Sequence, residues 1–174
     1  MPTHPPIIHY AERPHQKFNL IWAAASEKGL WVLSYGIDQS EFIKAIQARG
    51  DVNPIYSEEQ LAPYLDQVEA YLAGTLHRFE LPIDWTGMTA FQIAVRQAVT
   101  QLPYGQTASY GDIAAAVGNP RAARAVGGVQ ANNPISFVIP CHRVISSDGS
   151  LHGYGGFGGV QSKAWLLELE SKNN

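Results

Sequence analysis

The sequence has 174 residues, of which 45% are apolar and 16% are charged, and its net charge is −3. This length and composition fit one medium domain or two small ones with a buried core, and they exclude a disordered chain. The sequence shows no signal-peptide pattern and no apolar run of the roughly 18–20 residues that a membrane span needs. We therefore expect a cytoplasmic protein that does not enter a membrane.

The first half of the chain predicts a hairpin and two helices. Residues 18–24 and 30–35 are rich in β-branched and aromatic side chains, and turn-forming residues lie between them. Helices are predicted over residues 38–48 and 58–73, because apolar side chains recur there at helical spacing and a glycine follows each segment. Pro63 falls inside the second pattern and predicts either a kink or a later start of that helix.

Residues 81–87 show no clear periodicity and are predicted to link two domains. The N-terminal α/β domain covers residues 1–85 and the C-terminal domain covers residues 86–174. Thr89, with a glutamine three residues later, has the capping-box pattern of a helix start, and Pro103 ends that helix.

A helix-turn-helix is predicted next. Its first helix starts at Ser109 and stops at Gly118, and Asn119 is predicted to cap a second helix over residues 120–130. Residues 113–143 contain arginines but no Asp or Glu, which predicts a neutral-to-basic face suited to a DNA backbone. The alternative is a core segment of small residues that simply lacks charges.

The single cysteine, Cys141, is the strongest chemical signal. A short apolar strand is predicted over residues 137–139 and ends at Pro140, so the thiol is expected at a strand end and not within the core. A thiol attacks as the thiolate, and the imidazole of His142 can take its proton directly or through one water. Neighbours in an extended chain point to opposite faces, so a tight turn is needed to bring the two together.

The last part of the chain combines a glycine-rich loop with a helix. Six glycines lie between residues 149 and 159. The final helix, predicted over residues 162–170, is expected to bury Trp165, Leu166 and Leu169.

The segment Pro140-Cys141-His142-Arg143-Val144 resembles the active-site signature of the O6-alkylguanine-DNA alkyltransferases. The resemblance covers residues 86–170 and includes, in the family's order, the segments FQIAVRQAVTQLPYG, SYGDIA, AARAVG, NP, GY and KAWLLELE. It implies an α/β (α+β) fold, in which a small N-terminal sheet-plus-helix domain precedes a mostly helical C-terminal domain with the helix-turn-helix and the active-site cysteine.

The resemblance also implies an activity. Such proteins repair double-stranded DNA that contains O6-alkylguanine, with O4-alkylthymine as a further candidate substrate. They flip out the damaged nucleotide and move its alkyl group irreversibly to their own cysteine, once per molecule. The resemblance implies a monomer that needs no cofactor. No metal site is expected, because the four histidines of the N-terminal half lack partner cysteines.

The catalytic set implied by the resemblance has five members. Cys141 accepts the alkyl group, and His142 acts as its base through a water. Glu170 orients the imidazole and stabilises its charge. Asn133 fixes the turn that brings the helix-turn-helix against the cysteine segment. Tyr110 presses on the phosphate beside the target and donates a proton to the departing guanine.

The resemblance further implies a DNA-binding face and a base pocket. Arg124 enters the duplex in place of the flipped base, and small side chains let the second helix lie in the minor groove. The predicted DNA-contacting residues are Tyr110, Arg121, Ala122, Ala123, Arg124 and Gly127. The predicted substrate pocket is formed by Val144, Tyr154, Gly155, Gly156 and Phe157.

The sequence departs from the family pattern in the glycine-rich loop. Gly155 stands where the family carries a small hydroxyl residue, and residues 155–159 form a longer loop than the family's. This departure predicts a mobile loop and a roomier pocket.

Two other functions are weighed against alkyl transfer. A non-enzymatic reader of alkylated DNA shares the fold but lacks the cysteine, so the presence of Cys141 argues against it. A Cys-His hydrolase turns over many times, whereas an alkyl acceptor reacts once.

Overall fold

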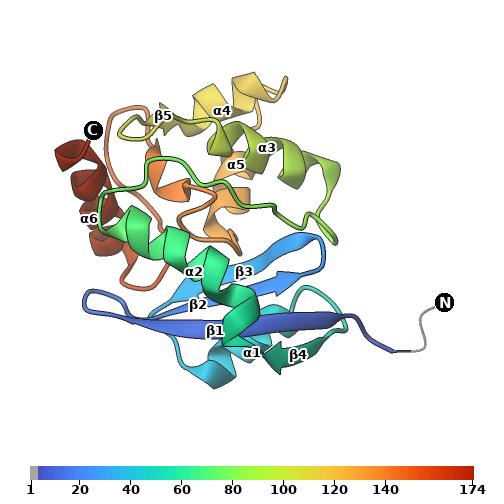
Figure 1. The fold of residues 1–174 in the computed structure, drawn as a ribbon. Helices are drawn as coiled ribbons and strands as arrows, with labels where there is room; N and C mark the ends of the chain where they lie inside the picture. The colour runs from blue at the N-terminus through green and yellow to red at the C-terminus, as the bar shows by residue number, and fades with distance from the viewer. Residues whose placement is uncertain (1–3) are drawn as a thin grey trace. The chain divides into compact units, whose positions relative to one another are not determined.

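A computed structural model describes residues 4–174 of the protein. The chain divides into two compact units, Met1–Gly87 and Met88–Asn174 (Figure 1). No helix within residues 4–174 is long and apolar enough to cross a membrane. The predicted order, a sheet-plus-helix unit followed by a mostly helical unit, is confirmed.

The first unit is built on a four-stranded sheet with the order β3-β2-β1-β4. Strands β1 (Ile7–His15), β2 (Asn19–Ser26) and β3 (Gly29–Tyr35) are antiparallel neighbours, and β4 (Asn53–Tyr56) pairs in parallel with β1. The predicted hairpin is confirmed as β2–β3. Strands β1 and β4 were not predicted, because prolines and polar residues interrupt their β pattern.

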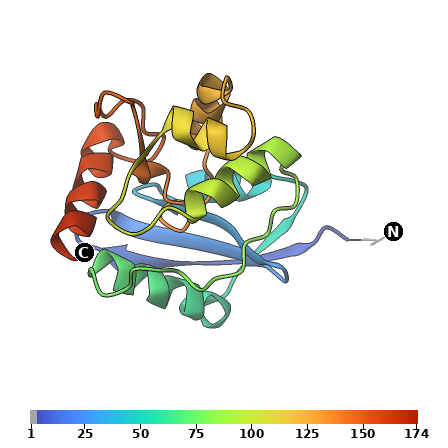
Figure 2. The ribbon, with the colours of Figure 1, turned by 90° about the horizontal axis from the view of Figure 1, so that it is seen from above.

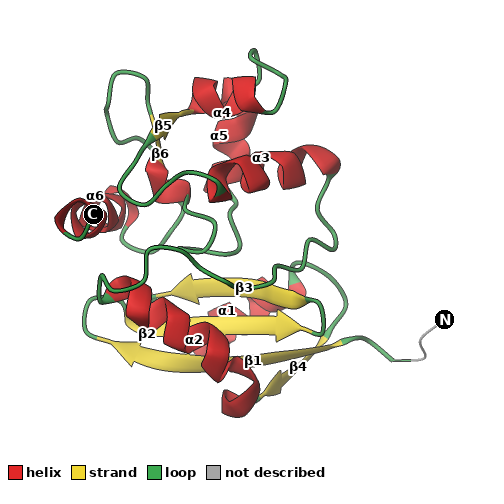
Figure 3. Cartoon of the chain, turned by 45° about the horizontal axis from the view of Figure 1, so that its top comes forward, coloured by secondary structure: helices red, strands yellow, loops and turns green. Residues whose placement is uncertain are grey.

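Helices α1 (Gln39–Gln47) and α2 (Glu58–Leu72) lie on opposite faces of this sheet (Figures 2 and 3). The Asp38 side chain caps α1, and the Ser57 side chain caps α2. Pro63 lies inside α2 and does not delay its start, so the expectation of a later start was wrong.

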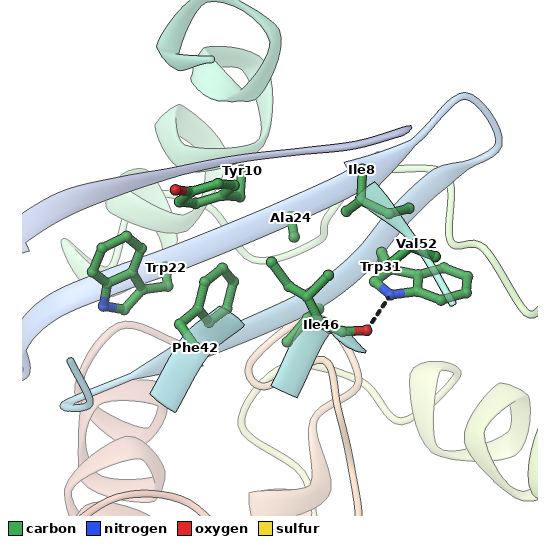
Figure 4. Packing of buried hydrophobic residues seen from close by; sticks show 9 residues of the cluster. Ile8, Tyr10, Trp22, Ala24, Trp31, Phe42, Ile46 and Val52 are labelled. Carbon is green, nitrogen blue, oxygen red and sulfur yellow. Dashed lines mark hydrogen bonds between the residues drawn. The ribbon is translucent and has the colours of Figure 1, made fainter. Parts of the chain in front are cut away.

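The core between α1 and the sheet is aromatic (Figure 4). The Trp31 indole donates a hydrogen bond to the Ile46 carbonyl at 3.2 Å, and Trp22 stacks on Phe42 with ring centroids 5.3 Å apart. Fully burying one such side chain stabilises the fold by about 1.5–3 kcal/mol. The cluster comprises Ile8, Tyr10, Trp22, Ala24, Trp31, Val32, Phe42, Ile46 and Val52.

The segment predicted as a linker, residues 81–87, is hydrogen-bonded to the start of β3. The Leu30 amide donates to the Pro82 carbonyl at 2.8 Å, and the Asp84 amide donates back to the Leu30 carbonyl at 3.0 Å. Gly29 permits this approach, because a Cβ there would lie 2.4 Å from the Pro82 oxygen. Part of the linker is therefore an extension of the first unit's sheet.

The second unit is mostly helical. The capping box predicted at Thr89 and the helix start predicted at Ser109 are both confirmed, and Ser109 also forms a capping box. The helices are α3 (Ala90–Thr100), α4 (Tyr110–Ala116), α5 (Ala123–Ala131) and α6 (Gly159–Lys172), with a short 3-10 turn η1 (Cys141–Arg143). Two short strands, β5 (Ala108–Ser109) and β6 (Val144–Ile145), pair in parallel.

The second helix of the helix-turn-helix starts later than predicted. Residues 119–122 form a turn closed by a hydrogen bond from the Ala122 amide to the Asn119 carbonyl at 2.9 Å. Helix α5 starts at Ala123 without a side-chain cap, so Asn119 is not its N-cap. Proline fits the second position of a β-turn as well as the first position of a helix, and here the turn is formed.

The apolar segment before the cysteine is not the predicted strand. Phe137 has a positive φ of 66°, and the Ile139 amide donates to the Ile135 carbonyl at 3.1 Å, so the backbone turns. The Asn133 side chain also donates to the Ile135 and Ile139 carbonyls, at 3.3 and 2.9 Å. A turn that satisfies these carbonyls locally has no need of a partner strand.

The buried face of α6 also differs from the prediction. Ser162, Lys163, Leu166 and Glu170 are buried, whereas Trp165 and Leu169 are only partly buried. An apolar pattern cannot indicate this face, because two of its residues are charged and are buried against polar partners.

Candidate active site

Cys141 begins the turn η1 and is 8% exposed. The Asn133 amide nitrogen lies 3.2 Å from Sγ and donates to it, while Asn133 Oδ1 accepts from the Ile135 amide at 3.1 Å. Asn133 therefore holds both the turn and the thiol. The prediction of an exposed thiol at a strand end was wrong, because the turn folds the cysteine into the core of the second unit. The tight turn η1 carries both Cys141 and His142.

Glu170 on α6 is completely buried and accepts hydrogen bonds from three directions. His142 Nε2 lies 2.7 Å from Oε1, and Arg143 Nε lies 2.9 Å from Oε2. The Gly105 amide donates to Oε2 at 3.0 Å. The fold therefore brings together a histidine and a carboxylate that are separated in the sequence by the whole glycine-rich loop and most of α6.

Arg143 was expected to contribute to a basic face, and this was wrong. The side chain is buried, and besides its bonds to Glu170 it donates to the Leu102 carbonyl at 2.6 Å. Its charge neutralises Glu170 and is not presented to solvent.

The tautomer of His142 follows from this pairing. Burial opposes the ionisation of Glu170, but hydrogen bonds with His142 and Arg143 and the positive charge of Arg143 hold its pKa well below 4.5, so it remains ionised. An ionised carboxylate can only accept a hydrogen bond, so Nε2 carries the proton and donates it in this hydrogen bond, which leaves Nδ1 as the basic nitrogen. Burial lowers the pKa of His142 below 6.5, although Glu170 opposes this. The imidazole is therefore neutral at neutral pH and can act as a base.

The thiol is held in its protonated form at rest. Burial raises the pKa of Cys141 above 9.0, while the Asn133 hydrogen bond, the Lys163 charge and a hydrogen bond with Tyr154 lower it in part. Reaction therefore requires a base, and the partial stabilisation of the thiolate makes deprotonation easier.

Lys163 on α6 was not among the predicted site residues. It is 1% exposed, and its Nζ donates to the Val144 carbonyl at 2.7 Å. The same nitrogen lies 5.9 Å from the centre of the Tyr110 ring. Its position three residues before Leu166 and seven before Glu170 places all three on one helix face, which was a usable signal.

The predicted DNA-contacting residues lie on or next to α4 and α5, which pack together. Arg121 and Arg124 are exposed, while Ala122 and Ala123 are half-buried. A Cβ on Gly127 would meet the Tyr110 ring at 4.0 Å, so α5 passes close to that tyrosine. Burial raises the pKa of Tyr110 above 10.0, so its hydroxyl keeps its proton.

The predicted pocket residues occupy different surroundings. Val144 is buried in β6, and Tyr154 hydrogen-bonds with Cys141. A Cβ on Gly155 would lie 2.3 Å from the Ala131 carbonyl oxygen, so this glycine permits the loop to touch the end of α5. Gly156 is half-buried, whereas Phe157 is 54% exposed.

Residues 4–174 contain no cluster of three or more His, Cys, Asp or Glu side chains that could hold a metal ion.

This chain is similar in sequence and fold to known proteins. The family described as 6-O-methylguanine DNA methyltransferase, DNA binding domain, matches residues 90–172. The methylated-DNA–protein-cysteine methyltransferase of Mycobacterium bovis is 51% identical over 106 residues, which are 61% of this chain and 62% of that protein. That of Methanosarcina acetivorans is 44% identical over 116 residues, which are 67% of this chain and 72% of that protein.

A solved structure extends the similarity to nearly the whole chain. The crystal structure of Mycobacterium tuberculosis OGT in complex with DNA has a TM-score of 0.78 and 37% sequence identity, covering 95% of this chain and 94% of that chain. The sequence match to the Mycobacterium bovis protein, by contrast, spans less than two thirds of that protein's length.

Proposed function

Because the chain belongs to the methylated-DNA–protein-cysteine methyltransferase family, we propose that it is a DNA repair protein that transfers an alkyl group from O6-alkylguanine to its own Cys141. The observation that carries this proposal is a lone, buried thiol that accepts a hydrogen bond from Asn133 and begins the turn that also carries His142, whose imidazole pairs with Glu170 on α6. The substrate is double-stranded DNA, and O4-alkylthymine is a further substrate to test.

The proposed reaction begins with a proton transfer. Cys141 Sγ loses its proton through a water to neutral His142, and Glu170 stabilises the resulting imidazolium. The thiolate attacks the alkyl carbon, so a sulfur–carbon bond forms as the carbon–O6 bond breaks. The electron pair goes to O6 of guanine, and Tyr110 donates the proton that restores the normal base. A thioether has no good leaving group, so each molecule reacts once.

The proposed DNA-binding element is the helix-turn-helix. Helix α5 approaches the minor groove through its small residues, and Arg124 fills the space left by the flipped nucleotide. The exposure of Arg124 supports this role. The solved relative in complex with DNA supports a DNA partner for this chain. On this proposal the protein is a monomer that acts in the cytoplasm.

Mass spectrometry tests the proposal directly. After mixing with a duplex that contains O6-methylguanine, the intact protein is expected to gain one methyl group, located on the peptide with Cys141. Cys141→Ala should lose transfer and still bind the methylated duplex. A methyl group on any other residue, or many turnovers per molecule as for a hydrolase, contradicts the proposal.

A further inference from the structure

Arg96 on α3 is a buried cation without a carboxylate partner. It is 3% exposed, and its guanidinium donates to the Asn132 carbonyl and contacts Met88 Sδ, both at 3.0 Å. Among residues 4–174, no carboxylate forms an ion pair with it, and its Nε has no hydrogen-bond partner. Burying a guanidinium without an opposite charge is costly, so a nearby group that becomes negative is expected.

The backbone connects Arg96 to the thiol. The carbonyl that accepts from Arg96 belongs to Asn132, and the next residue, Asn133, donates to Cys141 Sγ at 3.2 Å. Arg96 thus fixes the peptide unit that precedes the side chain in contact with the sulfur. The neutral Met88 sulfur on its other side cannot balance its charge.

The charges around the thiol come from several elements. Burial lowers the pKa of Arg96, and the negative charge of Cys141 opposes this effect. Burial also lowers the pKa of Lys163 on α6, the negative charge of Cys141 opposes that effect, and the Lys163 charge in turn lowers the pKa of Cys141. Tyr110 on α4, Tyr154 in the glycine-rich loop and His142 in η1 are the other titratable groups that face this site.

We propose that Arg96 is a positioning residue of the alkyl-transfer site, which fixes the Asn132–Asn133 segment against Cys141 and favours the thiolate through its buried positive charge. This inference deepens the proposed function and rests on it for its biological meaning. In the resting protein the cation has no anionic partner, and it gains one when Cys141 loses its proton to His142. It loses that partner again when the sulfur–carbon bond forms.

The first test measures the ionisation of Cys141 without DNA. The chain has one cysteine and eight tyrosines, and tyrosinate absorbs in the same ultraviolet range as a thiolate. The absorbance of each protein followed against pH, minus that of the same protein carrying Cys141→Ser, therefore reports on the thiol. Arg96→Met should raise the midpoint by about half a pH unit, which is roughly a threefold loss of thiolate at a given pH below the midpoint. Arg96→Lys keeps the charge and should restore most of the shift. Gln97→Met, on the exposed side of the same helix, is the matched control.

A structural role alone predicts a different result. If Arg96→Met lowers the unfolding temperature but leaves the thiol midpoint where it is in the unsubstituted protein, the inference is overturned. Methyl transfer is not part of this measurement, so such a failure leaves the proposed function standing. If the unsubstituted protein shows no methyl transfer, the proposed function is contradicted. The inferred effect of the Arg96 charge on Cys141 would still stand.

A second test does not depend on whether the Arg96 variants fold. In the unsubstituted protein, the NMR signal of Arg96 Nε is expected to shift with pH and to inflect at the midpoint found by ultraviolet absorbance. In Cys141→Ser the inflection should disappear. If the Arg96 Nε signal shows no inflection at the pH where Cys141 ionises, the inference is overturned.

Discussion

Glu170 is the residue on which most of the site depends. Its side chain is closed to solvent, and its two oxygens accept from His142, from Arg143 and from the Gly105 amide. A buried carboxylate is stable only when its lone pairs are satisfied and its charge is balanced, and both conditions hold here. One side chain therefore sets the tautomer of the base and holds the turn that carries the thiol.

We expect Glu170→Gln to slow methyl transfer on the order of 10²-fold, because the imidazolium loses its stabilising charge. The free energy of unfolding should fall by about 3–5 kcal/mol, because Arg143 is left buried without a counter-charge. Single-turnover rates and urea unfolding measure the two effects. Glu168→Gln removes an exposed carboxylate of the same helix and should change neither. Equal losses of DNA binding and transfer would contradict a role in the proton transfer.

The close approach of the Ala131 carbonyl leaves no room for a side chain at Gly155. The sequence comparison suggested that a hydroxyl side chain is missing there, but the Ala131 carbonyl occupies the space that its Cβ needs. We expect Gly155→Ser to destabilise the protein by about 1–3 kcal/mol and to displace the loop from α5. Thermal unfolding measures the cost. Gly128→Ser, where a Cβ meets nothing within 4 Å, is the control and should cost little. If Gly155→Ser is as stable as the unsubstituted protein, the glycine-rich loop can move away from α5 at no cost, and this prediction is contradicted.

At the scale of the element, α5 presents one exposed arginine near its start. We expect Arg124→Ala to slow repair of O6-benzylguanine in duplex DNA strongly, because the flipped state loses the side chain that fills the gap. Reaction with the free base O6-benzylguanine needs no flipping and should be nearly unchanged. Arg78→Ala, an exposed arginine of the first unit, controls for the loss of one positive charge. Equal loss on both substrates would assign Arg124 a structural role.

Helix starts were predictable because their signals are local. The capping boxes at Thr89 and Ser109 need only residues three apart in the sequence, and both are formed. Helix α5 begins three residues later than expected, because Asn119 and Pro120 suit a turn as well as a cap. Strands β1 and β4 depend on partners elsewhere in the chain, and their own residues carry a weak pattern.

The sequence predicted the reactive residues of the site but not the charged side chains that are buried around them. The Cys-His pair and Glu170 were identified through resemblance, and the structure brings His142 and Glu170 into contact. Arg96, Arg143 and Lys163 were missed as site residues because charged side chains are normally assigned to the surface. Their burial becomes understandable only when the carbonyls, the thiol and the carboxylate around them are known.

At the scale of the whole molecule, acid should destabilise the fold in two steps. Burial lowers the pKa of His142, so as the pH falls below 6.5 the unfolded chain takes up a proton that the native histidine does not. The pKa of Glu170 is also lowered, so its contribution is present above 4.5 and is lost as the pH falls further. Urea unfolding at a series of pH values measures both steps. The slope below pH 4.5 should be smaller in Glu170→Gln, and an unchanged slope would contradict this assignment.

The edge strand β4 of the first unit is poorly suited to pair with a strand of another molecule. Strand β4 has a single hydrogen-bonded neighbour, is four residues long and contains Pro54, which has no N–H to donate. Ile55 and Tyr56 are exposed there, so the edge is apolar enough to attract another chain. The missing donor and the short length deny an incoming strand a continuous ladder. We therefore expect β4 to resist pairing with strands of other molecules, and so to resist amyloid-like assembly at high protein concentration.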